Sequence, residues 1–169
     1  MRIANLLLVS ALGLSSLTGC SSNNMVERHR FAEQQTEYWM VAQVEDDQTL
    51  VLTQGDRTES ALLCGIRPPA TGETLAQESL DHLKYLLGES AEGEVGVVPV
   101  DRDPLGRLVA KVFVPTGGAE EIHVNSQMVL DGMATVGEMV QDCPNGLVMV
   151  AAEDRAKEAA VGMWKKAGE

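Results

Sequence analysis

The stretch "TLVLTQGDRTESALLCGIRPP", residues 49–69, predicts a pair of strands that ends in an irregular turn. Residues 49–53 and 58–66 have the aliphatic and threonine-rich composition of strands, and the polar "QGDR" between them is a typical turn. The two prolines fix their own φ angles and restrict the residue before them, so the strand is expected to end at Ile66. Loops that follow strands often contain catalytic or binding residues, so Arg67 and the residues after it are candidates for a functional site.

The elements on either side of this stretch follow the order of an OB-fold barrel. "YWMVAQV", residues 38–44, predicts a strand before it, and a capping box of Thr74 and Gln77 predicts a helix after it. Three strands, a helix and two further strands are the order of this barrel. We therefore predict an α+β domain over residues 38–166, a five-stranded OB-fold-type β-barrel with a helix after strand three and two C-terminal helices. The remaining elements are expected at residues 75–88 (helix), 93–100 and 107–114 (strands), 125–134 (helix), 135–140 (short strand) and 147–164 (helix).

The charge of the chain disfavours nucleic acid as a partner. Among its 169 residues, 13 are lysine or arginine and 25 are aspartate or glutamate, which gives a formal net charge of −12. Proteins that bind nucleic acid rely on clustered basic residues, and no run of basic residues occurs in this sequence. The field of the whole molecule is therefore expected to repel a polyanion.

The first twenty residues have the pattern of an export signal. Arg2 precedes an apolar run from Leu6 to Leu14, which is too short to cross ~30 Å of hydrocarbon. The segment ends in "LTGC", residues 17–20, which resembles the lipobox of bacterial lipoproteins. An ordinary cleaved signal with a chance cysteine is the alternative.

The lipobox resemblance implies that residues 1–19 are a signal peptide and that Cys20 carries a diacylglyceryl group and usually an N-acyl chain. Residues 20–37 would then form a lipid-anchored flexible tether, and the protein would be held at a membrane outside the cytoplasm. Ser21 and Ser22 stand where aspartate would favour the inner membrane. By family analogy, this favours the outer membrane, facing the periplasm, if the cell is Gram-negative.

Two cysteines remain in the rest of the chain, Cys64 and Cys143. An exported protein meets an oxidising compartment, where an even number of cysteines favours a disulfide. We predict that these two residues pair; the alternative is two separate buried thiols.

Four stretches carry a shared pattern: "LLCGIRPP" (residues 62–69), "DRDPLGRLVAKVFV" (101–114), "VNSQMVLDGMATV" (124–136) and "AAEDRAKEAAVGMW" (151–164). Together they resemble the staphylococcal-nuclease (thermonuclease) family. Their order and spacing make the match strong, and it covers about residues 38–166. The resemblance implies the barrel predicted above and, in active members of the family, calcium-dependent hydrolysis of phosphodiester bonds in DNA or RNA.

Most residues that such an enzyme needs are replaced in this sequence. Only Arg107 matches, as the second of two phosphate-binding arginines. The replaced positions are Gln48 and Arg67 (calcium-binding aspartates), Leu62 (the first phosphate-binding arginine), Pro68 (a threonine) and Ala70 (the general-base glutamate).

Other carboxylates offer an alternative register for the same site. If a bulge turned Asp46 or Asp47 inward and Glu73 reached back across "PPATG", a carboxylate site would be restored. Arg67 would still place a positive charge where calcium should bind, and like charges at ~4 Å in a cleft repel by several kcal/mol.

The turn "RDPLGR" offers a second kind of site. Arg102 and Arg107 are candidate ligands for a phosphate or sulfate group. The three histidines lack the spacing of metal ligands, so no metal site is expected, and calcium is expected only if the nuclease alternative holds.

Three hypotheses follow for the function. The favoured one is an envelope lipoprotein whose degenerate thermonuclease-like domain binds or supports an envelope protein or another envelope component. The first alternative is a membrane-anchored, calcium-dependent nuclease. The second is a module that binds a small anion or a glycan around Arg107, in the cleft that holds the substrate in active members of the family.

Overall fold

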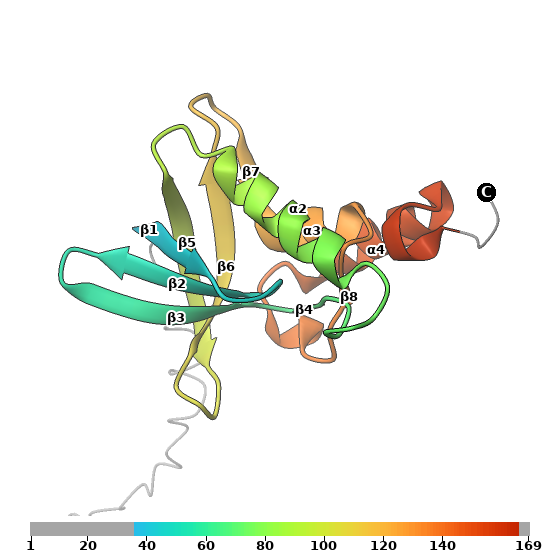
Figure 1. Cartoon of the computed structure of the whole chain (residues 1–169), viewed down its shortest axis with the longest axis horizontal. Helices are drawn as coiled ribbons and strands as arrows, with labels where there is room; N and C mark the ends of the chain where they lie inside the picture. Colours follow the sequence, from blue (N-terminus) through green and yellow to red (C-terminus); the bar gives the residue numbers. More distant parts are fainter. Residues whose placement is uncertain (1–35, 166–169) are drawn as a thin grey trace, which may run out of the picture.

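A computed structural model describes residues 36–165 of the chain. In this part of the chain, five strands close into a barrel, and β3 pairs in parallel with β6 to complete it. Its strands, in the order in which they pair, are β3 (Arg57–Leu63), β2 (Thr49–Gln54), β1 (Glu37–Val44), β5 (Glu94–Arg102) and β6 (Leu108–Pro115). The predicted α+β fold with an OB-fold-type barrel is confirmed (Figure 1).

Three short strands lie outside the barrel proper. β7 (Glu121–His123) extends the sheet beside β6, and β4 (Ile66–Arg67) pairs with β8 (Thr135–Val136). The predicted strand over residues 58–66 was therefore too long, because the chain leaves the barrel after Leu63. Gly65 makes the break: its φ of +73° lies in the left-handed region that glycine adopts without strain.

Helices α2 (Ala76–Gly88), α3 (Val124–Leu130) and α4 (Gly146–Ala159) pack beside the barrel on one side (Figure 1). The predicted capping box of Thr74 is wrong, because Leu75 precedes α2 in the left-handed region and no side chain caps the helix.

The predicted helices over residues 125–134 and 147–164 were too long at their C-terminal ends. Short 3-10 turns, η2 (Val140–Asp142) and η3 (Gly162–Trp164), flank α4. A Cβ on Gly162 would lie 2.2 Å from the carbonyl oxygen of Gly132, so the close approach of η3 to the turn after α3 requires glycine at position 162.

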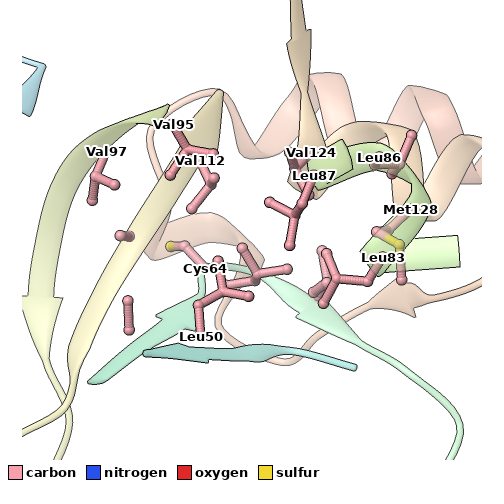
Figure 2. Close-up of a cluster of buried hydrophobic side chains, with 14 of the residues drawn as sticks. Leu50, Cys64, Leu83, Leu86, Leu87, Val95, Val97, Val112, Val124 and Met128 are labelled. Carbon is pink, nitrogen blue, oxygen red and sulfur yellow. The ribbon is translucent and has the colours of Figure 1, made fainter. Parts of the chain in front are cut away.

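The hydrophobic core continues from the barrel interior to the helices. Figure 2 shows Leu50, Val97 and Val112 of the barrel together with Leu83 of α2 and Met128 of α3, all of them fully buried. The core is almost entirely aliphatic, as the low aromatic content of 4% requires. This packing fixes the ends of β3 and β5, where the candidate site lies.

Candidate functional site

A cleft of about 570 Å³ opens at one end of the barrel. Its walls are the β3–β4 turn, the β5–β6 hairpin and the loop that runs from β8 into η2. In Figure 1 the hairpin turn (yellow) lies at the lower end of β5 and β6, and the loop after β8 (orange) lies beside β4. Side chains that carry no polar group line much of the cleft, among them Leu62, Ile66, Val100 and Val109.

The cleft contains three of the positions that the family resemblance assigns to a nuclease site. Gln48, Leu62 and Arg67 all line it. Leu62 is half-buried, whereas Arg67 is exposed. Among residues 36–165, Arg67 takes part in no ion pair. The wall that would meet a phosphate and a calcium ion in an active member therefore carries an isobutyl group, an amide and a guanidinium group.

Arg107 is held by a carboxylate rather than left free for a ligand. Its Nε donates to Asp103 Oδ2 at 2.7 Å, and the Arg107 backbone N–H donates to Asp103 Oδ1 at 2.9 Å. Burial acts to raise the pKa of Asp103, but the hydrogen bonds from Arg107 and from the backbone N–H of Leu105 outweigh it and lower that pKa. The carboxylate of Asp103 is therefore ionised at neutral pH, and Arg107 is not among the residues that line the cleft.

Arg102 is also paired, but with a different partner. Its two terminal nitrogens donate to the two carboxylate oxygens of Glu59 at 3.0 Å each, and Nη1 also donates to the carbonyl of Gly106 at 2.8 Å. The hydrogen bond from Arg102 lowers the pKa of Glu59, so this pair is also charged at neutral pH. An anion placed between Arg102 and Arg107 would have to compete with two carboxylates.

The candidate carboxylates line a second, smaller pocket of about 380 Å³. Gln48 and Arg67 line both pockets, whereas Asp46, Asp47 and Glu73 line only the smaller one. Glu73 does reach back, but its Oε2 accepts the backbone N–H of Ala70 at 2.9 Å and so closes the turn. Partial burial raises the pKa of Asp47.

These residues do not form the ligand set of a hard cation. Calcium takes six to eight oxygen ligands, several of them carboxylates. Gln48 offers one neutral oxygen and Arg67 offers none, and no three His, Cys, Asp or Glu side chains converge as a metal site within residues 36–165. Asp101, Asp103, Glu138 and Asp142 also line the cleft, but no three of them converge on one point within the described residues, so the cleft does not fit a calcium ion.

A disulfide joins Cys64 to Cys143 across the cleft, with the Cα atoms 6.0 Å apart, which confirms the predicted pairing. Both residues line the cleft, so the bond ties the β3–β4 turn to the loop before α4. Buried Asn125 supports the same turn, because its Nδ2 donates to the carbonyl of Cys64 at 2.9 Å.

Three cleft residues had no recognisable signal in the sequence. Glu138, Met139 and Asp142 line the cleft and are all exposed. They come from a loop whose position depends on the pairing of β4 with β8 and on the disulfide. Neither motif nor periodicity marks such residues, because they meet only through tertiary structure.

Cys20, the predicted lipid attachment site, lies outside the described residues, as do the signal peptide and most of the tether. Within the described residues, the helices are too short or too polar to span a membrane.

Comparison with known proteins agrees with the geometry of the barrel and cleft. The family model described as staphylococcal nuclease homologue matches residues 60–166, from β3 to beyond the last helix. No curated protein matches the chain.

Proposed function

Since the chain belongs to the staphylococcal nuclease homologue family, we propose that it is a degenerate member of that family whose cleft binds a partner instead of cutting nucleic acid. The single observation that carries this proposal is the composition of the cleft wall. Leu62 and Arg67 face the space where an active member would hold a phosphate and a cation. The first cannot contact a phosphate by hydrogen bonding, and the second repels a metal ion.

The loss of the remaining groups supports the same conclusion. Ala70 has no side chain that can activate a water molecule, and the nearby carboxylate of Glu73 is engaged with the Ala70 backbone. Removal of a general base alone typically slows a reaction by ~10²- to 10⁴-fold. Without a metal ion to stabilise the charge that develops on the phosphoryl oxygens, the rate falls further. Arg107 remains, but Asp103 occupies it.

The proposal is tested by assaying release of acid-soluble fragments from single-stranded DNA at saturating calcium. We expect no release above background. Cleavage that disappears with EDTA and in Arg107→Ala would contradict the proposal and favour the nuclease alternative. Cleavage that survives Arg107→Ala would indicate a contaminating nuclease. The assay would then be repeated on protein from which the contaminant has been removed, and that result would decide the question.

A converse experiment uses the same scaffold with the family residues restored. The five substitutions are Gln48→Asp, Leu62→Arg, Arg67→Asp, Pro68→Thr and Ala70→Glu. This variant is expected to gain weak calcium-dependent cleavage while the parent stays silent, because the barrel that positions these residues is unchanged. Equal cleavage by parent and variant would contradict the assignment of the cleft residues.

The location of this module follows from the lipobox resemblance, and we propose that the acylated Cys20 anchors it at the cell envelope. Residues 17–20, "LTGC", support this placement. Cells are labelled with radioactive palmitate, and the parent is compared with Cys20→Ala. Label is expected on the parent only, and the parent should fractionate with membranes. A parent that takes up no label and fractionates as a soluble protein would contradict the anchor.

A further inference from the structure

The cleft combines an apolar wall with an acidic rim, and both features point to one class of ligand. Its volume of about 570 Å³ lies within the range of ordinary ligand sites. Leu62, Val100 and Val109 are half-buried and line it, so their exposed faces are available to a bound apolar group. Covering them would remove apolar surface from water, which favours binding.

Apolar side chains also extend outside the cleft. Met139 lines the loop wall and is 60% exposed. On the hairpin wall, Leu105 is 80% exposed and directly follows Pro104, which lines the cleft. Exposed apolar residues that gather around a cleft mark a protein contact, since a small ligand inside would leave them in water. Methionine also adapts its shape to different partners.

The carboxylates on the rim set the charge of the partner. Asp101, Glu138 and Asp142 line the cleft, and within residues 36–165 none of them takes part in an ion pair. Arg67 and Arg102 also line the cleft, but Arg102 is paired with Glu59, so three carboxylates without an ion-pair partner face one such guanidinium group among the described residues. The unpaired charge that faces the cleft is therefore negative, and it complements a cation.

We propose that the cleft binds a short segment of a partner protein in which apolar residues alternate with lysine or arginine. The apolar side chains contact the wall at Leu62 and Val109, and the basic side chains contact Asp101, Glu138 and Asp142. This inference rests on the proposed binding function, and it names the chemistry of the ligand. The net charge of −12 adds long-range attraction for such a segment.

Fluorescence anisotropy with the purified protein and labelled, terminally blocked peptides tests the inference. The probe is an eight-residue peptide of alternating leucine and lysine. Two matched peptides replace lysine with glutamate or leucine with serine. The leucine–lysine peptide is expected to bind at least about tenfold more tightly than either of the others. Only this peptide has both apolar side chains for the cleft wall and cations for the rim carboxylates. Equal binding of all three would overturn the inference.

Neutral variants locate the contact. Asp101→Asn, Glu138→Gln and Asp142→Asn together are expected to weaken binding about tenfold, the sum of three exposed ion pairs. The matched control, Asp56→Asn, Glu92→Gln and Glu120→Gln, removes the same net charge from exposed positions that do not line the cleft. If the control variant loses as much peptide affinity, the peptide is attracted by the net charge of the whole molecule, and the assignment of binding to the cleft is wrong.

Apolar variants test the wall in the same way. Met139→Ser is expected to weaken binding severalfold, whereas Val148→Ser, at 54% exposure on α4 and outside the cleft, should leave it unchanged. Thermal unfolding of each variant checks that the fold is retained. The titrations contain EDTA and no nucleic acid, so they do not depend on catalysis. Absence of peptide binding in a protein that also fails to cleave DNA would overturn the ligand class and leave the proposed function intact.

Discussion

Asn125 offers a quantitative test of how the cleft is held in place. The residue lies in the first turn of α3 and is fully buried. Its Oδ1 accepts the backbone N–H of Val112 at 3.0 Å, and its Nδ2 donates to the carbonyls of Cys64 at 2.9 Å and Ala110 at 3.2 Å. One side chain thus joins strand β6 to the turn that carries the disulfide.

The cost of removing this side chain follows from the groups that it leaves behind. In Asn125→Leu the side chain keeps a similar volume but forms no hydrogen bond. The carbonyl of Ala110 keeps a partner, because the Cys64 backbone N–H donates to it at 2.8 Å. The N–H of Val112 and the carbonyl of Cys64 lose theirs, and each unsatisfied buried group costs ~1–3 kcal/mol. We expect a loss of about 2–6 kcal/mol, against a total stability of ~5–15 kcal/mol.

Urea unfolding of the purified protein, followed by circular dichroism, measures this loss. Ser126→Ala is the control, since Ser126 is the next residue on α3 and its hydroxyl contacts only the half-buried ring of His123. The control should lose less than about 1 kcal/mol. If Asn125→Leu also unfolds within about 1 kcal/mol of the parent, the hydrogen bonds of Asn125 do not hold the turn, and the reasoning is wrong.

Three further perturbations test other parts of the fold by the same unfolding measurement. Removing the disulfide with Cys64→Ala and Cys143→Ala should cost ~4 kcal/mol, because it frees a loop closed over 79 residues; a loss below about 1 kcal/mol would contradict the loop-closure argument. Gly65→Ala should cost about 2–4 kcal/mol, since φ is +73° and the added Cβ would lie 2.9 Å from Cys143 Sγ, which the disulfide holds in place; an unchanged urea midpoint would show that the turn relaxes freely. Burial, together with the charge of a nearby lysine, lowers the pKa of His123 to about 4, so the unfolded chain binds the proton first as the pH falls below 6.5. Stability should therefore drop by about 2.5 kcal/mol more in the parent than in His123→Gln between pH 8 and pH 4.5, and equal pH profiles would contradict the burial of a neutral ring.

The order of the barrel strands was predictable because it depends on local signals. Polar turns with glycine separate apolar runs of strand length, and a pattern of that kind needs no knowledge of distant residues. The pairing of Cys64 with Cys143 was also predicted, because setting Cys20 aside as the expected lipid attachment site leaves one way to pair the other two cysteines. The replaced positions of the nuclease site followed from the family resemblance, and the structure places Gln48, Leu62 and Arg67 in one cleft.

The partners of the two candidate anion-binding residues were not predictable. Arg102 meets Glu59, which lies 43 positions earlier in the sequence, through side chains at the edge of the barrel. Arg107 meets Asp103 because the β5–β6 hairpin turns at the residues between them. Helix ends were missed for a similar reason: Ala160 adopts a left-handed φ of +51° although its sequence neighbours favour helix. In each case tertiary contacts decide between local conformations of similar energy.

The residues that match the family motifs most clearly have structural roles in this molecule. Asn125 satisfies three backbone groups, and Glu153, also buried, accepts the backbone N–H of Val136 at 2.9 Å and so holds β8 against α4. Gly162 is required by its approach to Gly132. Matches at these positions report the fold and carry no information about catalysis, because the same contacts are needed whether or not the cleft holds a substrate. The activity must be inferred from the positions of the nuclease site, where the one matching residue, Arg107, lies outside the cleft lining and already has a carboxylate partner.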